Sequence, residues 1–132
     1  MNRRCVMIFL ILLMIAAPAF GAKYKAPPDI VATLPQFCWA QYLDGAEDNP
    51  DFQIRGCGAH GNHYCPGLVR MTMAINEKTP GKRLEHLRRA KQEMEYTLRN
   101  TTNHPDCALR APAQLYLERI NLELEILKIR LR

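Results

Sequence analysis

The chain of 132 residues carries 18 basic and 13 acidic side chains, a net charge of +5, and 48% of its residues are hydrophobic. A chain of this length can bury one core and little more, so we expect a single domain. Its positive charge is mild and no basic run is interleaved with aromatic residues, which argues against nucleic-acid binding.

The first 21 residues have the pattern of a secretory signal peptide. Arg3 and Arg4 precede an uncharged apolar stretch, residues 6–17, and the Ala-Phe-Gly run at 19–21 fits the small-x-small rule for cleavage before Ala22. The apolar stretch is shorter than the roughly 20 residues that a membrane span needs, and an uncleaved anchor is the alternative. The sequence therefore predicts a periplasmic or secreted protein with no stable membrane span after cleavage.

Cleavage removes Cys5 and leaves an even number of cysteines. These are Cys38, Cys57, Cys65 and Cys107. In an exported chain, an even set predicts two disulfides, because the compartment is oxidising and a small core gains from covalent links.

The mature chain divides into a leader and a domain. Residues 22–33 are the predicted extended leader, since the segment KYKAPPDIVATLP at 23–35 carries three prolines and little periodicity. Residues 34–132 are the predicted disulfide-stapled helical domain. Its first segment, FCWAQYLDG, is typical of a short helix or of one strand, and the charged loop that follows favours the short helix.

Three longer helices follow in the sequence pattern. The first begins near Pro66 and ends before Pro80 and Gly81, the second covers about 82–100, and the third covers about 111–131. Short loops between consecutive helices predict antiparallel neighbours. The expected fold is all-α: a small antiparallel bundle of helical hairpins with three main helices and a short N-terminal helix.

The third helix has two lines of apolar residues. One is a heptad pattern of Leu117, Ile120, Leu124, Leu127 and Leu131. The other comprises Leu115, Leu122, Ile126 and Ile129. Two interpretations stay open: the helix lies between two others, or the second line binds a protein partner or a second copy of the chain.

The antiparallel arrangement suggests which cysteines meet. The start of the first helix, the end of the second and the start of the third lie at one end of such a bundle. Cys65 opens the first helix and Cys107 precedes the third, so we expect a Cys65–Cys107 disulfide. Cys38 and Cys57 flank the long loop and form the other expected pair, among the three pairings that four cysteines allow.

Three histidines accompany these cysteines. His60 and His63 lie in CGAHGNHYCPGL, and His104 lies three residues before Cys107. Imidazole groups near thiols suggest a zinc or copper site as an alternative function. Oxidised cysteines do not ligate metals as thiolates, and the paired C-x-x-C spacing of structural zinc sites is missing. The main expectation is therefore no cofactor.

The sequence shows no recognisable catalytic pattern. It lacks a Gly-rich phosphate loop, a G-x-S-x-G turn and an H-E-x-x-H helix, and it contains no serine at all. We therefore expect a non-catalytic protein.

One motif resembles a known group of proteins. His63, Tyr64, Cys65, Gly67 and Leu68 match an H-Y-C-x-G-L motif, and residues 90–100 match a helix of the form A-x-x-E-x-x-Y-x-L-R-N. Both are similar to motifs of exported proteobacterial proteins with tetratricopeptide-like helices. The resemblance implies helical hairpins, a periplasmic setting and protein binding as a scaffold or adaptor. Only about one and a half such units fit the chain, whereas a solenoid needs about three.

Overall fold

The computed structural model describes residues 24–132, a range that is helical and contains no β-strand. In chain order its elements are α1 (Pro28–Thr33), the 3-10 helices η1 (Gln36–Gln41), η2 (Pro50–Phe52) and η3 (Ala59–His63), then α2 (Tyr64–Asn76), α3 (Pro80–Asn100) and α4 (Arg110–Arg130). Within this range no helix is both long and apolar enough to cross a membrane. The all-α class is confirmed, while the predicted signal peptide, residues 1–21, lies outside the described residues.

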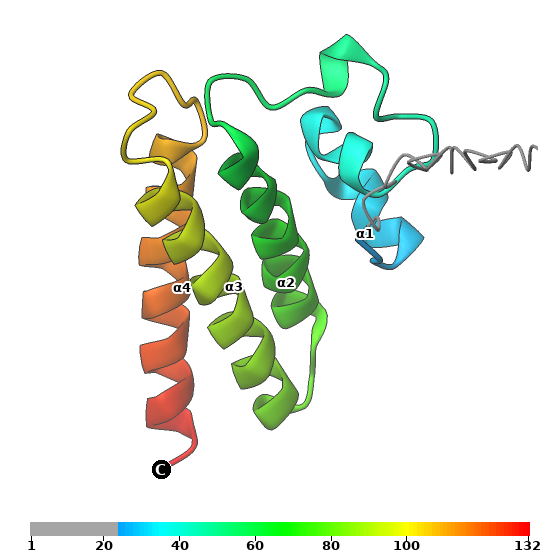
Figure 1. Cartoon of the computed structure of the whole chain (residues 1–132). Coiled ribbons are helices and arrows are strands. Elements are labelled where there is room, and N and C mark those ends of the chain that lie inside the picture. Colours follow the sequence, from blue (N-terminus) through cyan, green and yellow to red (C-terminus); the bar gives the residue numbers. More distant parts are fainter. Residues whose placement is uncertain (1–23) are drawn as a thin grey trace, which may run out of the picture.

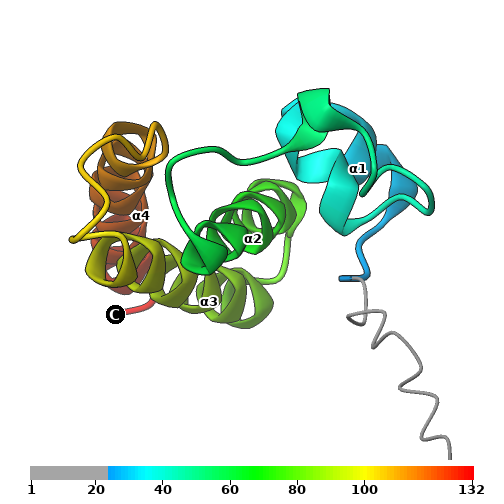
Figure 2. The same ribbon diagram turned by 45° about the horizontal axis from the view of Figure 1, so that its top comes forward.

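The three long helices lie in a row, and α3 is the middle one (Figure 1). The tilted view keeps α4 at one edge and shows α1 and the N-terminal 3-10 helices at the other, beyond α2 (Figure 2). Pro80 is the first residue of α3, a position where its missing N–H costs no hydrogen bond. Pro80 therefore ends the preceding helical pattern, as predicted, and is also the first residue of the next helix.

The core follows the helical periodicity of α2, α3 and α4. Leu87 and Met94 of α3 and Ile120 of α4 are 0–1% exposed and join the three helices. Gly67 allows α2 and α3 to approach closely, because a Cβ atom there would lie 2.7 Å from the Met94 Cε atom. Near the end of α2 the small side chain of Ala74 is buried, whereas the adjacent Ile75 is 52% exposed.

The N-terminal segment differs from the extended leader that its prolines predicted. Residues 28–33 form α1, in which Pro28 occupies the first turn and Ile30 and Val31 are buried. Proline fixes a φ angle that suits a first helical turn, so the Pro27-Pro28 pair starts this helix. The folded domain therefore begins before residue 34. The short helix expected at residues 37–45 is present as η1, a 3-10 helix.

Two disulfides are present, but the predicted pairing is wrong. Cys38 is bonded to Cys65 and Cys57 to Cys107, with S–S distances of 2.06 and 2.08 Å. Helix α3 lies between α2 and α4 and keeps Cys65 away from Cys107. The first disulfide joins η1 to the first turn of α2. The second joins the long loop before η3 to the loop that enters α4.

Tyr64 gives the fold a testable dependence on alkaline pH. Its side chain is 4% exposed, and burial, followed by the nearby Tyr116 phenol, raises its pKa to about 12. The unfolded chain ionises this phenol near its ordinary pKa of about 10. Stability should therefore be intact below about pH 10 and fall between about pH 10 and pH 12. Urea unfolding across this range measures the loss, which should be smaller in Tyr64→Phe; an equal loss in that variant contradicts the assignment.

Candidate functional site

Helix α4 carries apolar side chains on two opposite faces. Its inner face packs on α3 and buries Ala113, Ile120, Leu124 and Leu127. Four other apolar residues keep large exposed fractions: Leu115 68%, Leu122 62%, Ile126 37% and Ile129 72%. At 3.6 residues per turn, these four fall on one line along the side opposite the buried face. We call them the outer line.

The outer line faces away from the rest of the described domain. In residues 24–132, α3 is the only element with extensive packing on α4, and α2 occupies the opposite side of α3. The interpretation that α4 lies between two other helices is therefore wrong. α4 forms one edge of the row, and the residues proposed for partner binding are exposed there.

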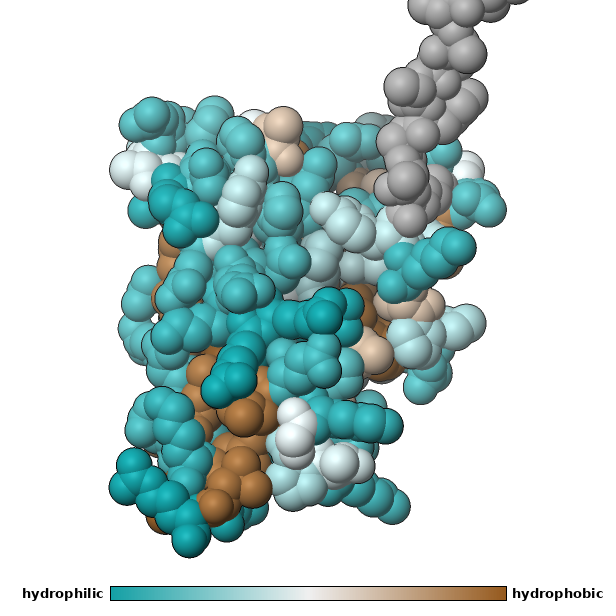
Figure 3. Space-filling view, turned by 60° about the horizontal axis from the view of Figure 1, so that its bottom comes forward, coloured by the Kyte–Doolittle hydropathy of each residue, from teal (hydrophilic) through white to brown (hydrophobic). Residues whose placement is uncertain are grey.

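Hydrophobic side chains also gather at the end of the molecule where α4 terminates. Figure 3 shows this end, with a band of hydrophobic residues between hydrophilic ones in the lower left. Two further large apolar residues near helix ends, Ile75 and Leu131, are 52% and 54% exposed. Contiguous apolar surface of this kind is typical of interaction sites.

Charged residues flank the outer line on both sides. Glu118 and Glu125 lie on one flank, Arg119 and Arg130 lie on the other, and all four are exposed. Glu125 forms an ion pair with Lys128 at 2.7 Å. No acidic partner within residues 24–132 lies within ion-pair distance of either arginine. Arg132 lies one heptad after Glu125, and Glu123 lies one heptad before Arg130, so each flank carries charges of both signs.

The histidines of the CGAHGNHYC stretch dock η3 onto α3. The Nδ1 atom of His63 lies 2.6 Å from the Glu93 Oε2 atom, and the Nδ1 atom of His60 lies 3.0 Å from the Tyr96 hydroxyl. The His63 ring also stacks on the Tyr96 ring, with centroids 3.8 Å apart. These imidazoles have a structural explanation in the contacts that hold the entrance of α2 against α3.

The sequence pattern indicated His60 and His63 but not their contacts with Tyr96 and Glu93. Glu93 and Tyr96 are three residues apart on a helix, and such residues share one face. Both belong to the A-x-x-E-x-x-Y motif, so the signal was present in the sequence. Local sequence patterns do not predict the path of the long loop, and this path brings His60 and His63 to this face.

His104, the third residue of the alternative metal site, lies in the loop before α4. Its ring packs on Gly58, where an added Cβ atom would lie 2.9 Å from the His104 Nε2 atom. Gly58 has a φ of 61°, a conformation that favours glycine. Across residues 24–132, no group of three or more His, Cys, Asp or Glu side chains is arranged to hold a metal ion. The described geometry therefore offers no set of metal ligands.

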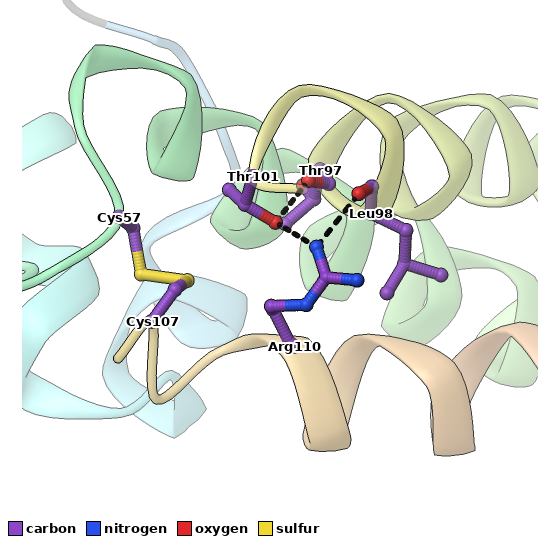
Figure 4. The surroundings of a disulfide bond; sticks show 6 residues. All are labelled: Cys57, Thr97, Leu98, Thr101, Cys107 and Arg110. Atoms are coloured by element: carbon purple, nitrogen blue, oxygen red, sulfur yellow. Dashed lines mark hydrogen bonds between the residues drawn. A yellow bond between two sulfur atoms is a disulfide. The ribbon is translucent and has the colours of Figure 1, made fainter. Parts of the chain in front are cut away.

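The Cys57–Cys107 disulfide lies beside the end of α3 and the start of α4 (Figure 4). There Arg110 donates from its Nη1 atom to the Leu98 carbonyl and to the Thr101 hydroxyl, both at 3.0 Å. The Thr101 hydroxyl donates in turn to the Thr97 carbonyl at 2.7 Å. A cation at a helix C-terminus also interacts favourably with the helix dipole. Arg110 thus fixes the turn from which α4 departs.

Replacing Arg110 with alanine should destabilise the domain. The half-buried guanidinium makes two charge-assisted hydrogen bonds, so we expect a loss of about 2 kcal/mol. Urea unfolding measures this loss. Arg119→Ala on the exposed side of the same helix is the control and should change stability by less than about 0.5 kcal/mol. Equal effects of the two substitutions contradict this role of Arg110.

Residues of the N-terminal segment 24–43 line two cavities of the described domain, away from the outer line. One has a volume of about 250 Å³ and is lined by Tyr24, Tyr42, Arg70 and Glu93, among others. The other, of about 350 Å³, is mostly apolar and includes Val31 and Trp39 in its lining. Burial raises the pKa of the Tyr42 phenol, with the Tyr24 phenol as a second cause.

Comparison of the chain with models of known protein families, with curated proteins and with solved structures finds no match. The functional argument therefore rests on the residues themselves.

Proposed function

We propose that this chain is an exported, non-catalytic helical module that binds another protein through the outer line of α4. The observation that carries the proposal is the exposure of Leu115, Leu122, Ile126 and Ile129 on a helix whose opposite face already packs on α3. The buried face accounts for the attachment of α4 to its own domain. The outer line adds nothing to that attachment.

Docking would give these side chains an energetic role. Full burial of one Leu or Ile side chain contributes about 1.5–3 kcal/mol, and three of the four are more than 60% exposed. Together they offer several kcal/mol to a partner, against the entropic cost of association. Recognition of an apolar helix face by a complementary groove or helix is a common binding mode.

The compartment supports the same proposal. Two disulfides indicate an oxidising, extracellular-type environment, and the signal-like residues 1–21 favour a periplasmic or secreted protein. The antiparallel α2–α3 pair with α4 beside it is compatible with the tetratricopeptide-like resemblance. Both observations support a scaffold or adaptor outside the cytoplasm.

Site-specific photo-crosslinking in the producing cell tests the proposal. A photoreactive amino acid at Leu122 should give a discrete crosslinked protein band. The same group at Arg88, an exposed position on α3, is the control and should give none. Mass spectrometry of the crosslinked peptides identifies the bound protein.

A second variant links the crosslink to the apolar surface. Adding Ile126→Glu to the Leu122 probe should abolish the band, because a carboxylate at the contact would be buried without a partner. A band that survives this change, or equal crosslinking from positions 122 and 88, contradicts docking through the outer line.

A further inference from the structure

The cavity of about 250 Å³ is bordered by the N-terminal segment, the end of η1, α2 and α3. Its lining combines apolar with polar and charged side chains. The apolar ones are Pro27, Pro66, Val69 and Met73, and the others are Tyr24, Lys25, Tyr42, Arg70 and Glu93. A concave site that joins an apolar surface to a few convergent polar groups is typical of small-molecule binding.

Arg70 and Glu93 bring opposite charges to this cavity without forming an ion pair with each other. The Glu93 Oε2 atom lies 2.6 Å from the His63 Nδ1 atom, whereas no carboxylate of residues 24–132 lies within ion-pair distance of Arg70. The half-buried guanidinium has one long polar contact in this range, 3.5 Å from its Nη1 atom to the His86 Nδ1 atom. A charge partly removed from water is stabilised by an anion, so Arg70 favours a carboxylate in the cavity.

Two phenols lie close to both charges. The ring centroids of Tyr24 and Tyr42 are 6.0 Å apart. Burial is the largest cause that raises the pKa of each phenol, and Glu93 raises both further, while Arg70 acts to lower that of Tyr42. A phenol hydroxyl can donate and accept hydrogen bonds. The cavity therefore gathers a cation, an anion and two hydroxyl groups.

The size and the apolar part of the lining restrict the ligand. Sites for drug-sized ligands have volumes of about 300–1,000 Å³, and this cavity is smaller, with about 250 Å³. Separate charges of both signs match a small molecule that has both a carboxylate and an ammonium group. Val69 and Met73 match an apolar side chain on the same molecule. A free amino acid has all three features, whereas the two charged groups of a peptide lie at opposite ends of its chain.

We propose that this cavity binds a free α-amino acid with an apolar side chain, whose carboxylate pairs with Arg70 and whose ammonium group pairs with Glu93. The Tyr42 hydroxyl donates to the same carboxylate, and Val69 and Met73 contact the apolar side chain. This binding is a second function, independent of the outer line, so its failure leaves the proposed function untouched.

NMR titration of the purified, disulfide-bonded protein with L-leucine tests the proposal. The methyl signals of Val69 and Met73 should shift and saturate, with a dissociation constant at or below about 1 mM. Two matched compounds each lack one charged group: 4-methylpentanoate has no ammonium group, and 3-methylbutylamine has no carboxylate. Each should bind about tenfold more weakly or worse, because it leaves Glu93 or Arg70 without its partner.

Variants assign the binding to the cavity. Arg70→Gln should weaken leucine binding about tenfold or more, and Tyr42→Phe, which removes one hydroxyl, about fivefold. Arg88→Gln removes an exposed charge of α3 and should leave binding unchanged. The spectrum of each variant also reports whether it is folded, and Tyr42→Phe provides the test if Arg70→Gln is not.

Three results would overturn the proposal. The first is the absence of a saturable shift at leucine concentrations up to about 10 mM. The second is leucine binding that is unchanged in the folded Arg70→Gln and Tyr42→Phe variants. The third is equal affinity for leucine and 4-methylpentanoate, which would exclude recognition of the ammonium group by Glu93.

Discussion

Replacing Cys57 and Cys107 together with alanine should lower the free energy of unfolding by about 4 kcal/mol. Their disulfide closes a segment with a sequence separation of 50 residues, and closing a long segment removes much conformational entropy from the unfolded chain. It also connects the long loop to the entrance of α4. Urea unfolding of the oxidised variant measures the effect.

The Cys38–Cys65 disulfide provides the matched comparison. Its sequence separation is 27 residues, so its double alanine variant should lose about 3.5 kcal/mol. Losses of this size are a large share of the stability of a small domain. A loss below about 1 kcal/mol in both variants would contradict the stabilising role of the two disulfides.

Replacing Ile120 with alanine should destabilise the domain by about 2–5 kcal/mol, because the side chain is fully buried between α4 and α3. Leu122→Ala, two residues along the same helix, removes a side chain that is 62% exposed. It should cost less than about 0.5 kcal/mol in the isolated chain. Thermal or urea unfolding of the monomeric protein compares the two.

This pair of variants separates the two faces of α4. Performing the comparison at a protein concentration well below that of assembly removes any contribution of binding to stability. If Leu122→Ala destabilises the isolated chain as strongly as Ile120→Ala, the outer line belongs to the fold of the domain and is not a free surface.

The periodic parts of the chain were predictable from its sequence. The heptad at Ile120, Leu124 and Leu127 indicated the buried face of α4, since residues three and four apart share one side of a helix. The second apolar line was equally visible. Whether another helix covered it depended on the order in which the helices pack, which local patterns do not specify.

The disulfide pairing and the N-terminal segment were also mispredicted because local patterns do not specify tertiary packing. We expected a Cys65–Cys107 disulfide because both residues lie at one end of the bundle. In the structure α3 separates them, and Cys107 is bonded to Cys57 in the long loop. The Pro27-Pro28 pair suggested extended chain, but burial of Ile30 and Val31 against the domain stabilises one helical turn there. In both cases tertiary packing decided between locally acceptable alternatives.

The cysteines and histidines of the segment CGAHGNHYC stabilise the fold. Both cysteines of CGAHGNHYC form disulfides to distant elements, and His60 and His63 contact Tyr96 and Glu93 of α3. Each feature ties the entrance of α2 to a neighbouring element. The candidate binding site therefore stays on α4, which packs mainly on α3 and forms one edge of the row of helices.

Footprinting of side chains with hydroxyl radicals, carried out on the protein in its own compartment, tests the docking role of the outer line most directly. As isolated surfaces, Leu115 (68%) and Ile129 (72%) are more exposed than Ile75 (52%), which lies at the end of α2. If a protein covers the outer line, Leu115, Leu122 and Ile129 should be labelled less than Ile75. Labelling that instead follows these exposed fractions would show the outer line open to solvent, and would contradict the proposed function.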